Sequence, residues 1–115
     1  MSAAAVTERL GIEPTYSHEA GDTFGPRGEQ RRGQAMWSLS TRDDGPGRLD
    51  EHLDRLLDRI EPKRPIIEDL AREGHQMDWF CCVRVDGGQG GVVLSVDLLQ
   101  RLAALPIELA LDIYG

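Results

Sequence analysis

The chain has 115 residues, of which 40% are hydrophobic and 29% are charged, and its formal net charge at pH 7 is −7. This composition is too apolar for a disordered chain and is typical of a single folded domain, which we expect to cover residues 1–115. The excess of acidic side chains repels phosphate backbones and anionic lipid surfaces, so we expect no nucleic acid and no membrane among its partners. No apolar run reaches the roughly 20 residues of a spanning helix and the start lacks a signal peptide, which predicts a cytoplasmic protein.

The first predicted element is a short helix over Ala3–Leu10, because Val6 and Leu10 share one stripe and Gly11 follows where a left-handed C-terminal cap is expected. No strand precedes this helix. We therefore expect that the chain has lost an N-terminal strand and that one position of its sheet is empty. Unpaired backbone groups at that position would favour a homodimer, or displacement of Tyr16–Phe24 into the vacancy.

The polar passage Tyr16–Gly33 is predicted to be an extended segment followed by a mobile loop, since it is rich in glycine. It lacks the Gly-Lys-Ser/Thr ending and the preceding strand of a phosphate-binding loop. Three arginines, Arg27, Arg31 and Arg32, nevertheless form a local basic cluster on an acidic chain. They are candidates for contact with a carboxylate or phosphate of a partner; the alternative is a solvated loop.

A strand is predicted over Gln34–Thr41, with Trp37 and Leu39 facing the core, and it ends at a turn signal over residues 43–47. After this turn the apolar period changes from that of a strand to that of a helix.

The predicted helix over Arg48–Glu61 carries one apolar stripe, formed by Leu49, Leu53, Leu56, Leu57 and Ile60. Its charged side chains occupy the outer arc, and we interpret them as a solvated face and not as a carboxylate site. Pro62 ends this helix, and Pro65 begins a second one over Ile66–Glu73, closed by Gly74. The two form either a helical hairpin or one bent helix.

The most strand-like run is Met77–Val85, in which apolar residues alternate. Trp79 and Cys81 lie on the face with more apolar residues, while Phe80 and Cys82 keep the opposite face half apolar. This pattern predicts an interior strand with partial cover on both sides.

The two cysteines, Cys81 and Cys82, are adjacent and point to opposite faces, so we expect two reduced thiols and no disulfide between them. The three histidines, His18, His52 and His75, are far apart and have no metal-ligand spacing around them. We therefore expect no metal and no cofactor.

The glycine-rich residues 86–91 are predicted to turn the chain into a strand at Val92–Leu94, in an antiparallel hairpin. Ser95 is the expected N-cap of a helix over Val96–Leu105, and Glu108–Tyr114 alternates as the last strand.

Together these elements predict an α+β fold: one mixed, mainly antiparallel sheet of about four strands, with the helices packed mostly on one face. The expected core consists of Trp37, Leu39, Leu53, Leu56, Ile60, Trp79, Cys81, Val83, Leu98, Leu102, Leu109 and Leu111. Leu99 and Leu105 are also expected to face inward.

In this order the segments Leu10–Thr15, Gly33–Leu39, Leu49–Ile60, Leu94–Leu99 and Leu111–Gly115 resemble a bacterial family described as domain of unknown function 4279. Members of that family usually begin with a strand before the first helix, which this sequence lacks. The resemblance implies no catalytic residues, because the family has none assigned.

No nucleophile with a base, metal spacing or carboxylate pair indicates an enzyme. We therefore expect a protein-interaction or immunity-type binding module, the immunity role by analogy with other small acidic domains. The alternative is a small-molecule-binding protein or minor enzyme with a polar site near Asp112 and Tyr114, which share a face of the last strand, as Asp78 and Arg84 share one in the Met77–Val85 strand. A pocket with convergent polar groups would favour the alternative, and an open strand edge with exposed apolar residues would favour binding.

Overall fold

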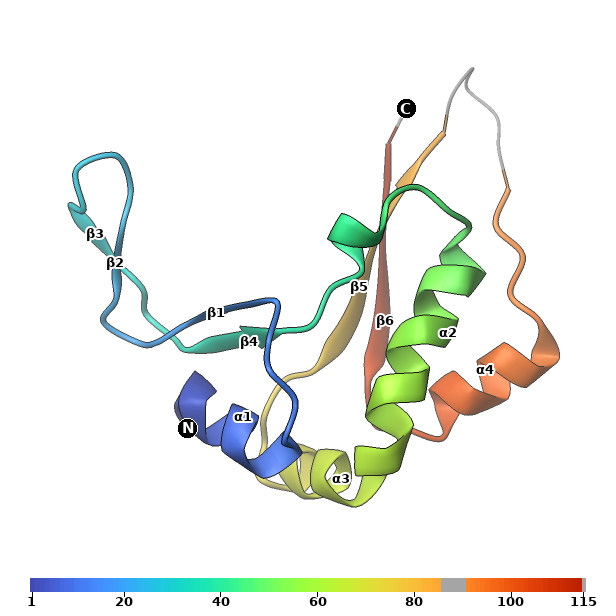
Figure 1. Ribbon diagram of the computed structural model, residues 1–115, viewed down its shortest axis with the longest axis horizontal. Coiled ribbons are helices and arrows are strands. Elements are labelled where there is room, and N and C mark those ends of the chain that lie inside the picture. The colour runs from blue at the N-terminus through green and yellow to red at the C-terminus, as the bar shows by residue number, and fades with distance from the viewer. Residues whose placement is uncertain (86–90, 115) are drawn as a thin grey trace. The chain divides into compact units, whose positions relative to one another are not determined.

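The computed structural model describes residues 1–85 and 91–114, which divide into two compact units, Met1–Asp44 and Gly45–Gly115. Helices and short strands occur in the chain, so the fold is a mixed α+β fold, as predicted (Figure 1). The elements of the first unit are α1 (Ala3–Leu10), β1 (Tyr16–His18), β2 (Thr23–Phe24), β3 (Gln30–Arg31), β4 (Met36–Ser38) and η1 (Arg42–Asp44). Those of the second are α2 (Leu49–Ile60), η2 (Glu61–Lys63), α3 (Arg64–Arg72), β5 (Asp78–Arg84), α4 (Val96–Ala103) and β6 (Glu108–Tyr114).

Helix α1 has the predicted bounds, and both of its ends are satisfied by specific groups. At the N-terminus, Ser2 is the N-cap, and the carboxylate of Glu19 accepts hydrogen bonds from the backbone N–H groups of Ala3 at 2.7 Å and Ala4 at 3.0 Å. A carboxylate at this end also interacts favourably with the partial positive charge of the helix dipole. At the C-terminus Gly11 adopts the expected left-handed conformation, with φ of 69°.

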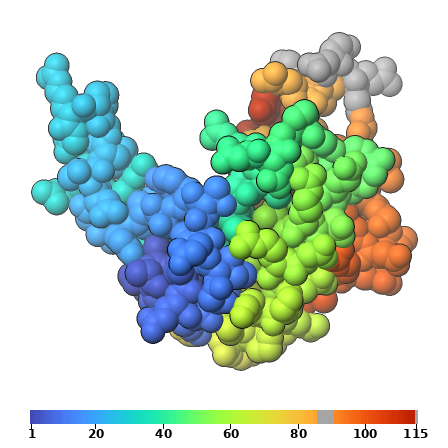
Figure 2. All heavy atoms as spheres, in the orientation of Figure 1, coloured from blue at the N-terminus to red at the C-terminus, as the bar shows by residue number. Residues whose placement is uncertain are grey.

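The remainder of the first unit is a long antiparallel ribbon, where the sequence predicted an extended segment and a mobile loop. β1 pairs with β4 and β2 pairs with β3, while hydrogen bonds from Gly21 N to Arg32 O and from Arg32 N to Asp22 O join the two pairs. Figure 2 shows the β2–β3 end (cyan) extending beyond the rest of this unit. The extended segment agrees with β1 and β2, but the ribbon pairing was missed because polar, glycine-containing strands that bury little have no apolar alternation to reveal them.

The predicted strand over Gln34–Thr41 shortens to β4, and its tryptophan packs against α1. The indole Nε1 of Trp37 donates a hydrogen bond to Thr7 Oγ1 at 3.0 Å, which ties β4 to the first helix. Trp37 and Leu39 are half-buried, so neither belongs to the fully buried core that the alternation predicted.

In the second unit, α2, η2 and α3 follow one another with no loop between them, which corresponds to the bent-helix alternative. Leu53, Leu57 and Ile60 are buried, as the apolar stripe predicted, whereas Leu56 is half-buried. Gly74 ends α3 with φ of 90°. The chain bends within η2, where Pro62 lies at the start of a turn and has no N–H to continue the α2 hydrogen bonds.

Strands β5 and β6 pair side by side in parallel, with Trp79 opposite Leu109 and Cys81 opposite Leu111. Parallel neighbours need a crossover connection of a dozen or more residues, which the segment containing α4 provides. The expected strand at Val92–Leu94 is wrong, because these residues are described as irregular chain; residues 86–90 of the expected hairpin lie outside the described residues. Ser95 caps α4 as predicted, its Oγ accepting from the N–H of Leu98 at 3.1 Å.

The prediction of one four-stranded, mainly antiparallel sheet is wrong. The described strands form three separate two-stranded sheets, β1–β4, β2–β3 and β5–β6. β5 was also expected to be an interior strand with partial cover on both sides, yet Phe80 is 65% exposed and β6 is the one described strand beside it. Alternation identifies a strand and its faces, but it contains no information on which strand lies next to it.

The buried core lies mainly on the helices and on one face of β5. It consists of Ala3, Leu10, Ile12, Leu53, Leu57, Ile60, Ile67, Leu70, Trp79, Cys81, Leu98, Leu102 and Leu105. The prediction was wrong for Leu109 and Leu111 on β6 and for Leu99 on α4, which are all exposed, and Val83 is half-buried. Leu109 and Leu111 share one sheet face with Trp79 and Cys81, but this face is covered over β5 and left exposed over β6.

We predict that Glu19→Ala lowers the free energy of unfolding by about 1 kcal/mol, because two N–H groups of α1 lose their acceptor and the helix dipole loses its anion. Urea denaturation followed by circular dichroism measures this difference. Glu13→Ala, at an exposed position in the loop after α1, is the control and is expected to change stability by less than about 0.5 kcal/mol. Equal losses in both variants would contradict the capping role.

Candidate functional site

The outer edge of β6 carries backbone groups that point away from its partner strand. The N–H of Glu108 donates to Met77 O at 3.2 Å, and the carbonyl of Tyr114 accepts from Val85 N at 2.8 Å. Because successive residues of a strand point their backbone groups to alternate sides, residues 108, 110, 112 and 114 face β5. Leu109, Leu111 and Ile113 therefore direct their N–H and C=O groups outward, where the described chain places no further strand.

The same three residues expose apolar side chains. Leu109 is 37% exposed, Leu111 47% and Ile113 61%. The register pairs them with Trp79, Cys81 and Val83, so they share the face of β5 that is buried at Trp79 and Cys81. We call these three residues, with their outward backbone groups, the open β6 edge. An edge that is both apolar and unpaired is a template for another strand, and proteins normally block such an edge with charge or proline.

The opposite face of the β5–β6 pair holds the residues predicted to form a polar site. The register places Asp112 beside Cys82 and Tyr114 beside Arg84, whose guanidinium carbon lies 5.7 Å from the centre of the tyrosine ring. Asp78 is at the other end of β5, opposite Glu108. The structure thus brings Arg84 to Tyr114, and it does not gather Asp78 with them.

Both cysteines are free thiols, as predicted. Cys81 is buried, and this burial raises the pKa of its thiol and keeps it protonated. Cys82 is exposed on the opposite face, beside Phe80. The different surroundings follow from their adjacent positions in one strand.

The three predicted arginine contacts lie on the β2–β3 end of the ribbon, and one of them is already engaged. The guanidinium of Arg32 stacks on Phe24 at 3.9 Å and donates to the hydroxyl of Tyr16 at 3.3 Å. Arg31 is an exposed neighbour in β3, and Arg27 lies in the exposed turn between β2 and β3. Their role as contacts for a carboxylate or phosphate of a partner stays a prediction.

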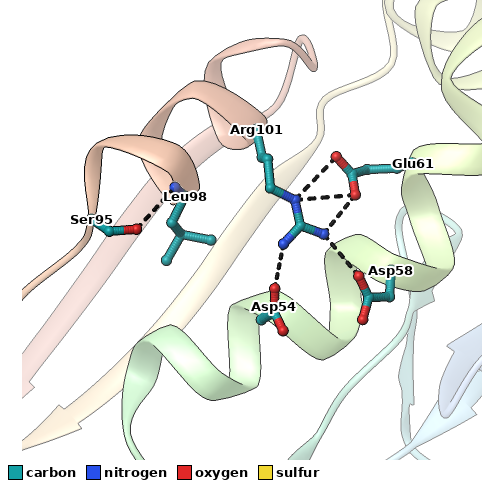
Figure 3. Close-up of polar contacts among 6 residues, drawn as sticks. All are labelled: Asp54, Asp58, Glu61, Ser95, Leu98 and Arg101. Atoms are coloured by element: carbon teal, nitrogen blue, oxygen red, sulfur yellow. Dashed lines mark hydrogen bonds and ion pairs between the residues drawn. The ribbon is translucent and has the colours of Figure 1, made fainter.

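A cluster that sequence reasoning missed joins α4 to α2 (Figure 3). The guanidinium of Arg101 donates to Glu61 at 2.6 Å, to Asp58 at 2.9 Å and also to Asp54. The carboxylates come from successive turns of α2 and the start of η2, and Figure 3 shows all three directed at the one guanidinium. A guanidinium has five N–H donors, which is why one arginine can satisfy three acceptors.

This cluster changes the ionisation of its members. Hydrogen bonding from Arg101 holds the pKa of Glu61 below its ordinary value of 4.5, against a smaller opposing effect of burial. The same contacts raise the pKa of Arg101, so its charge is retained at any ordinary pH. Asp54 and Asp58 remain largely exposed, but both are ion-paired with Arg101. The interpretation of the α2 charges as a purely solvated face is therefore wrong for these two residues. The spacing of the three carboxylates at i, i+4 and i+7 was the signal for a shared basic partner.

Described residues of the second unit line two open hollows. The larger, of about 510 Å³, lies between the α3 and α4 ends, at Glu68, Ala71 and Arg72 on one side and Ala103 to Pro106 on the other. The smaller hollow lies between the first turns of α2 and α4, and its lining includes Asp54 and Arg101. Neither of them reaches Asp112 or Tyr114.

Residues 1–85 and 91–114 contain no group of three or more His, Cys, Asp or Glu side chains arranged to hold a metal ion. In the same part of the chain no helix is sufficiently long and apolar to cross a membrane.

These features define a small α+β chain with a two-stranded parallel sheet whose outer edge is open. A family model described as domain of unknown function (DUF4279) matches residues 1–115, the whole chain. The chain belongs to this family, as its motifs indicated. Comparison with curated proteins and with solved structures found no match.

Two proline substitutions test the direction of the β6 backbone groups. Ala110→Pro removes an N–H that points at β5, whereas Leu111→Pro removes one that points outward. We expect Ala110→Pro to cost about 1 to 3 kcal/mol more stability than Leu111→Pro, measured by urea denaturation. The reverse order would mean that the edges of β6 are assigned the wrong way round.

The Arg101 cluster predicts an acid-dependent loss of stability. Because the pKa of Glu61 is lowered on folding, its carboxylate stabilises the fold above about pH 4.5, and this contribution disappears as the pH falls through the folded pKa. The advantage of wild type over Glu61→Gln should therefore be full at pH 7 and absent in strong acid. It is expected to be modest, since the Glu61 side chain is 39% exposed.

Urea denaturation at several pH values from 7 downward measures this difference. Glu13→Gln serves as the control for removing one carboxylate from an acidic chain. A difference between wild type and Glu61→Gln that stays constant from neutral pH into strong acid would contradict the role of Glu61.

Proposed function

We propose that this chain is a protein-interaction module and that the open β6 edge is its contact surface. A partner would add a strand beside β6, so that its backbone bonds to the outward groups of Leu109, Leu111 and Ile113. The observation that carries this proposal is the coincidence, on the same three residues, of unpaired backbone groups and exposed apolar side chains.

Two physical arguments support strand addition over a purely side-chain contact. A sheet of two strands is marginal in isolation, and parallel pairs are normally found in sheets that are covered on both faces. An added strand would therefore extend an incomplete sheet, and its side chains would cover the apolar row of β6. The exposed Phe80 and Tyr114 on the opposite face give such a partner further apolar contact.

The immunity-type version of this role would use the same edge to cover a partner protein and block it. An immunity role differs from any other protein interaction at this edge only in the activity of the partner. Identification of the partner therefore distinguishes the immunity role from other protein interactions. A small-molecule or enzymatic site at Asp112 and Tyr114 has less support, because neither hollow reaches these residues.

The proposal predicts that a charge on the β6 edge abolishes partner capture. Tagged wild type and Ile113→Lys, expressed in the native host and crosslinked in the cell, are compared by mass spectrometry. We expect wild type to capture specific proteins, further copies of the chain included, through crosslinks near residues 108–114, and Ile113→Lys to lose them because the charge cannot be buried beside a new strand.

Val93→Lys is the matched control, since Val93 is 84% exposed, lies outside every described strand and receives the same change of charge. It should capture the same proteins as wild type. Capture that survives Ile113→Lys, or crosslinks that map away from β5 and β6, would overturn the proposal. Circular dichroism of the purified variants checks that each one is folded.

A further inference from the structure

The sequence of β6 is complementary to itself when it is read in the opposite direction. Leu111 is the middle residue of Glu108–Tyr114, and outward-facing apolar residues lie two positions before and two positions after it. An antiparallel partner strand reverses the chain direction, so an identical strand can pair with this pattern about a two-fold axis.

We propose that a second copy of the chain pairs with the open β6 edge, antiparallel, with the two-fold axis at Leu111. This inference rests on the proposed function, because it names the partner that adds a strand. Leu111 then faces Leu111 of the second copy, and Leu109 faces Ile113 of the second copy. The two sheets join into a continuous four-stranded sheet across the axis.

The direction of the backbone groups fits this arrangement. In an antiparallel pair, residues that point their N–H and C=O groups at each other exchange two hydrogen bonds. Leu109, Leu111 and Ile113 all point outward from β6, and an axis at Leu111 opposes each of them to an outward-pointing residue. The pairing therefore forms about six backbone hydrogen bonds, two for each of three facing pairs.

Charge selects this register over its neighbours. With the axis at Leu111, Asp112 faces Ala110 of the second copy and Glu108 faces Tyr114, so no two carboxylates are opposite each other. Moving the axis to Asp112 brings two aspartates face to face, and moving it to Ala110 brings Glu108 opposite Asp112. Like charges directly opposite destabilise a strand pair. An axis at Leu109 or Ile113 avoids this but shortens the overlap.

The first test is the mass of the purified chain in solution, measured by sedimentation velocity over a range of concentrations. We expect a reversible dimer, and we expect Leu111→Lys to weaken it at least about tenfold because two lysines would then face each other at the axis. Val93→Lys adds the same charge away from the sheet and should leave dimerisation unchanged. A wild-type chain that stays monomeric at high concentration overturns the inference.

The second test reads the register by disulfide formation in a Cys82→Ser background, which leaves only the buried Cys81 thiol besides the introduced one. Facing residues in the proposed dimer have Cα atoms about 5.5 Å apart, within the range that a disulfide spans. Under mild oxidation Leu111→Cys should crosslink to itself, whereas Ala110→Cys and Asp112→Cys should not. Self-crosslinking of either of the latter two places the axis elsewhere and overturns the register.

The inference and the proposed function can fail separately or together. If the chain stays monomeric but still captures other proteins through residues 108–114 in the host, the second copy is the wrong partner and the open β6 edge remains the contact surface. If wild type dimerises through a rapid Cys82 disulfide, pairing occurs along β5 and the assignment to β6 is overturned. A wild-type chain that neither dimerises nor captures other proteins would overturn both proposals.

Discussion

The parallel pairing of β5 with β6 is the constraint on which the second unit depends. Parallel strands cannot be joined by a tight turn, so the chain must leave the end of β5 and return to the start of β6 through a crossover. Helix α4 lies in that crossover, and the Ser95 cap at its start and the Arg101 contacts to α2 hold it in position. One face of the pair is buried at Trp79 and Cys81, while the described residues place no strand at the outer edge of β6.

The Arg101 cluster and the open β6 edge are different kinds of feature. Three carboxylates around one guanidinium form a cluster in which every charged group has an opposite charge in contact, which favours a structural role in joining α4 to α2. The β6 edge, in contrast, has donors, acceptors and apolar side chains that remain unpaired within the described chain. Unpaired groups, and not satisfied ones, indicate where another molecule binds.

The family match and the exposed groups of the β6 edge answer different questions about this chain. The match over residues 1–115 identifies the chain as a member of the DUF4279 family, but it assigns no activity to any residue. The proposed interaction role comes entirely from the exposed backbone and side chains of β6, and the choice of a second copy as partner comes from the order of residues around Leu111. The choice of a second copy as partner can fail without affecting the proposed role of the β6 edge, whereas failure of that role would also remove the second copy as its partner.

The sequence predicted the features that depend on local interactions. These features are helices α1, α2 and α4, with the caps at Gly11 and Ser95, and strands β5 and β6. Caps and periodicity act within a few residues, so they are visible without the fold. The partner of each strand, the exposure of Leu109 and Leu111 and the capture of three carboxylates by Arg101 were decided by tertiary structure. They depend on contacts between residues distant in the chain, about which a local pattern carries no information.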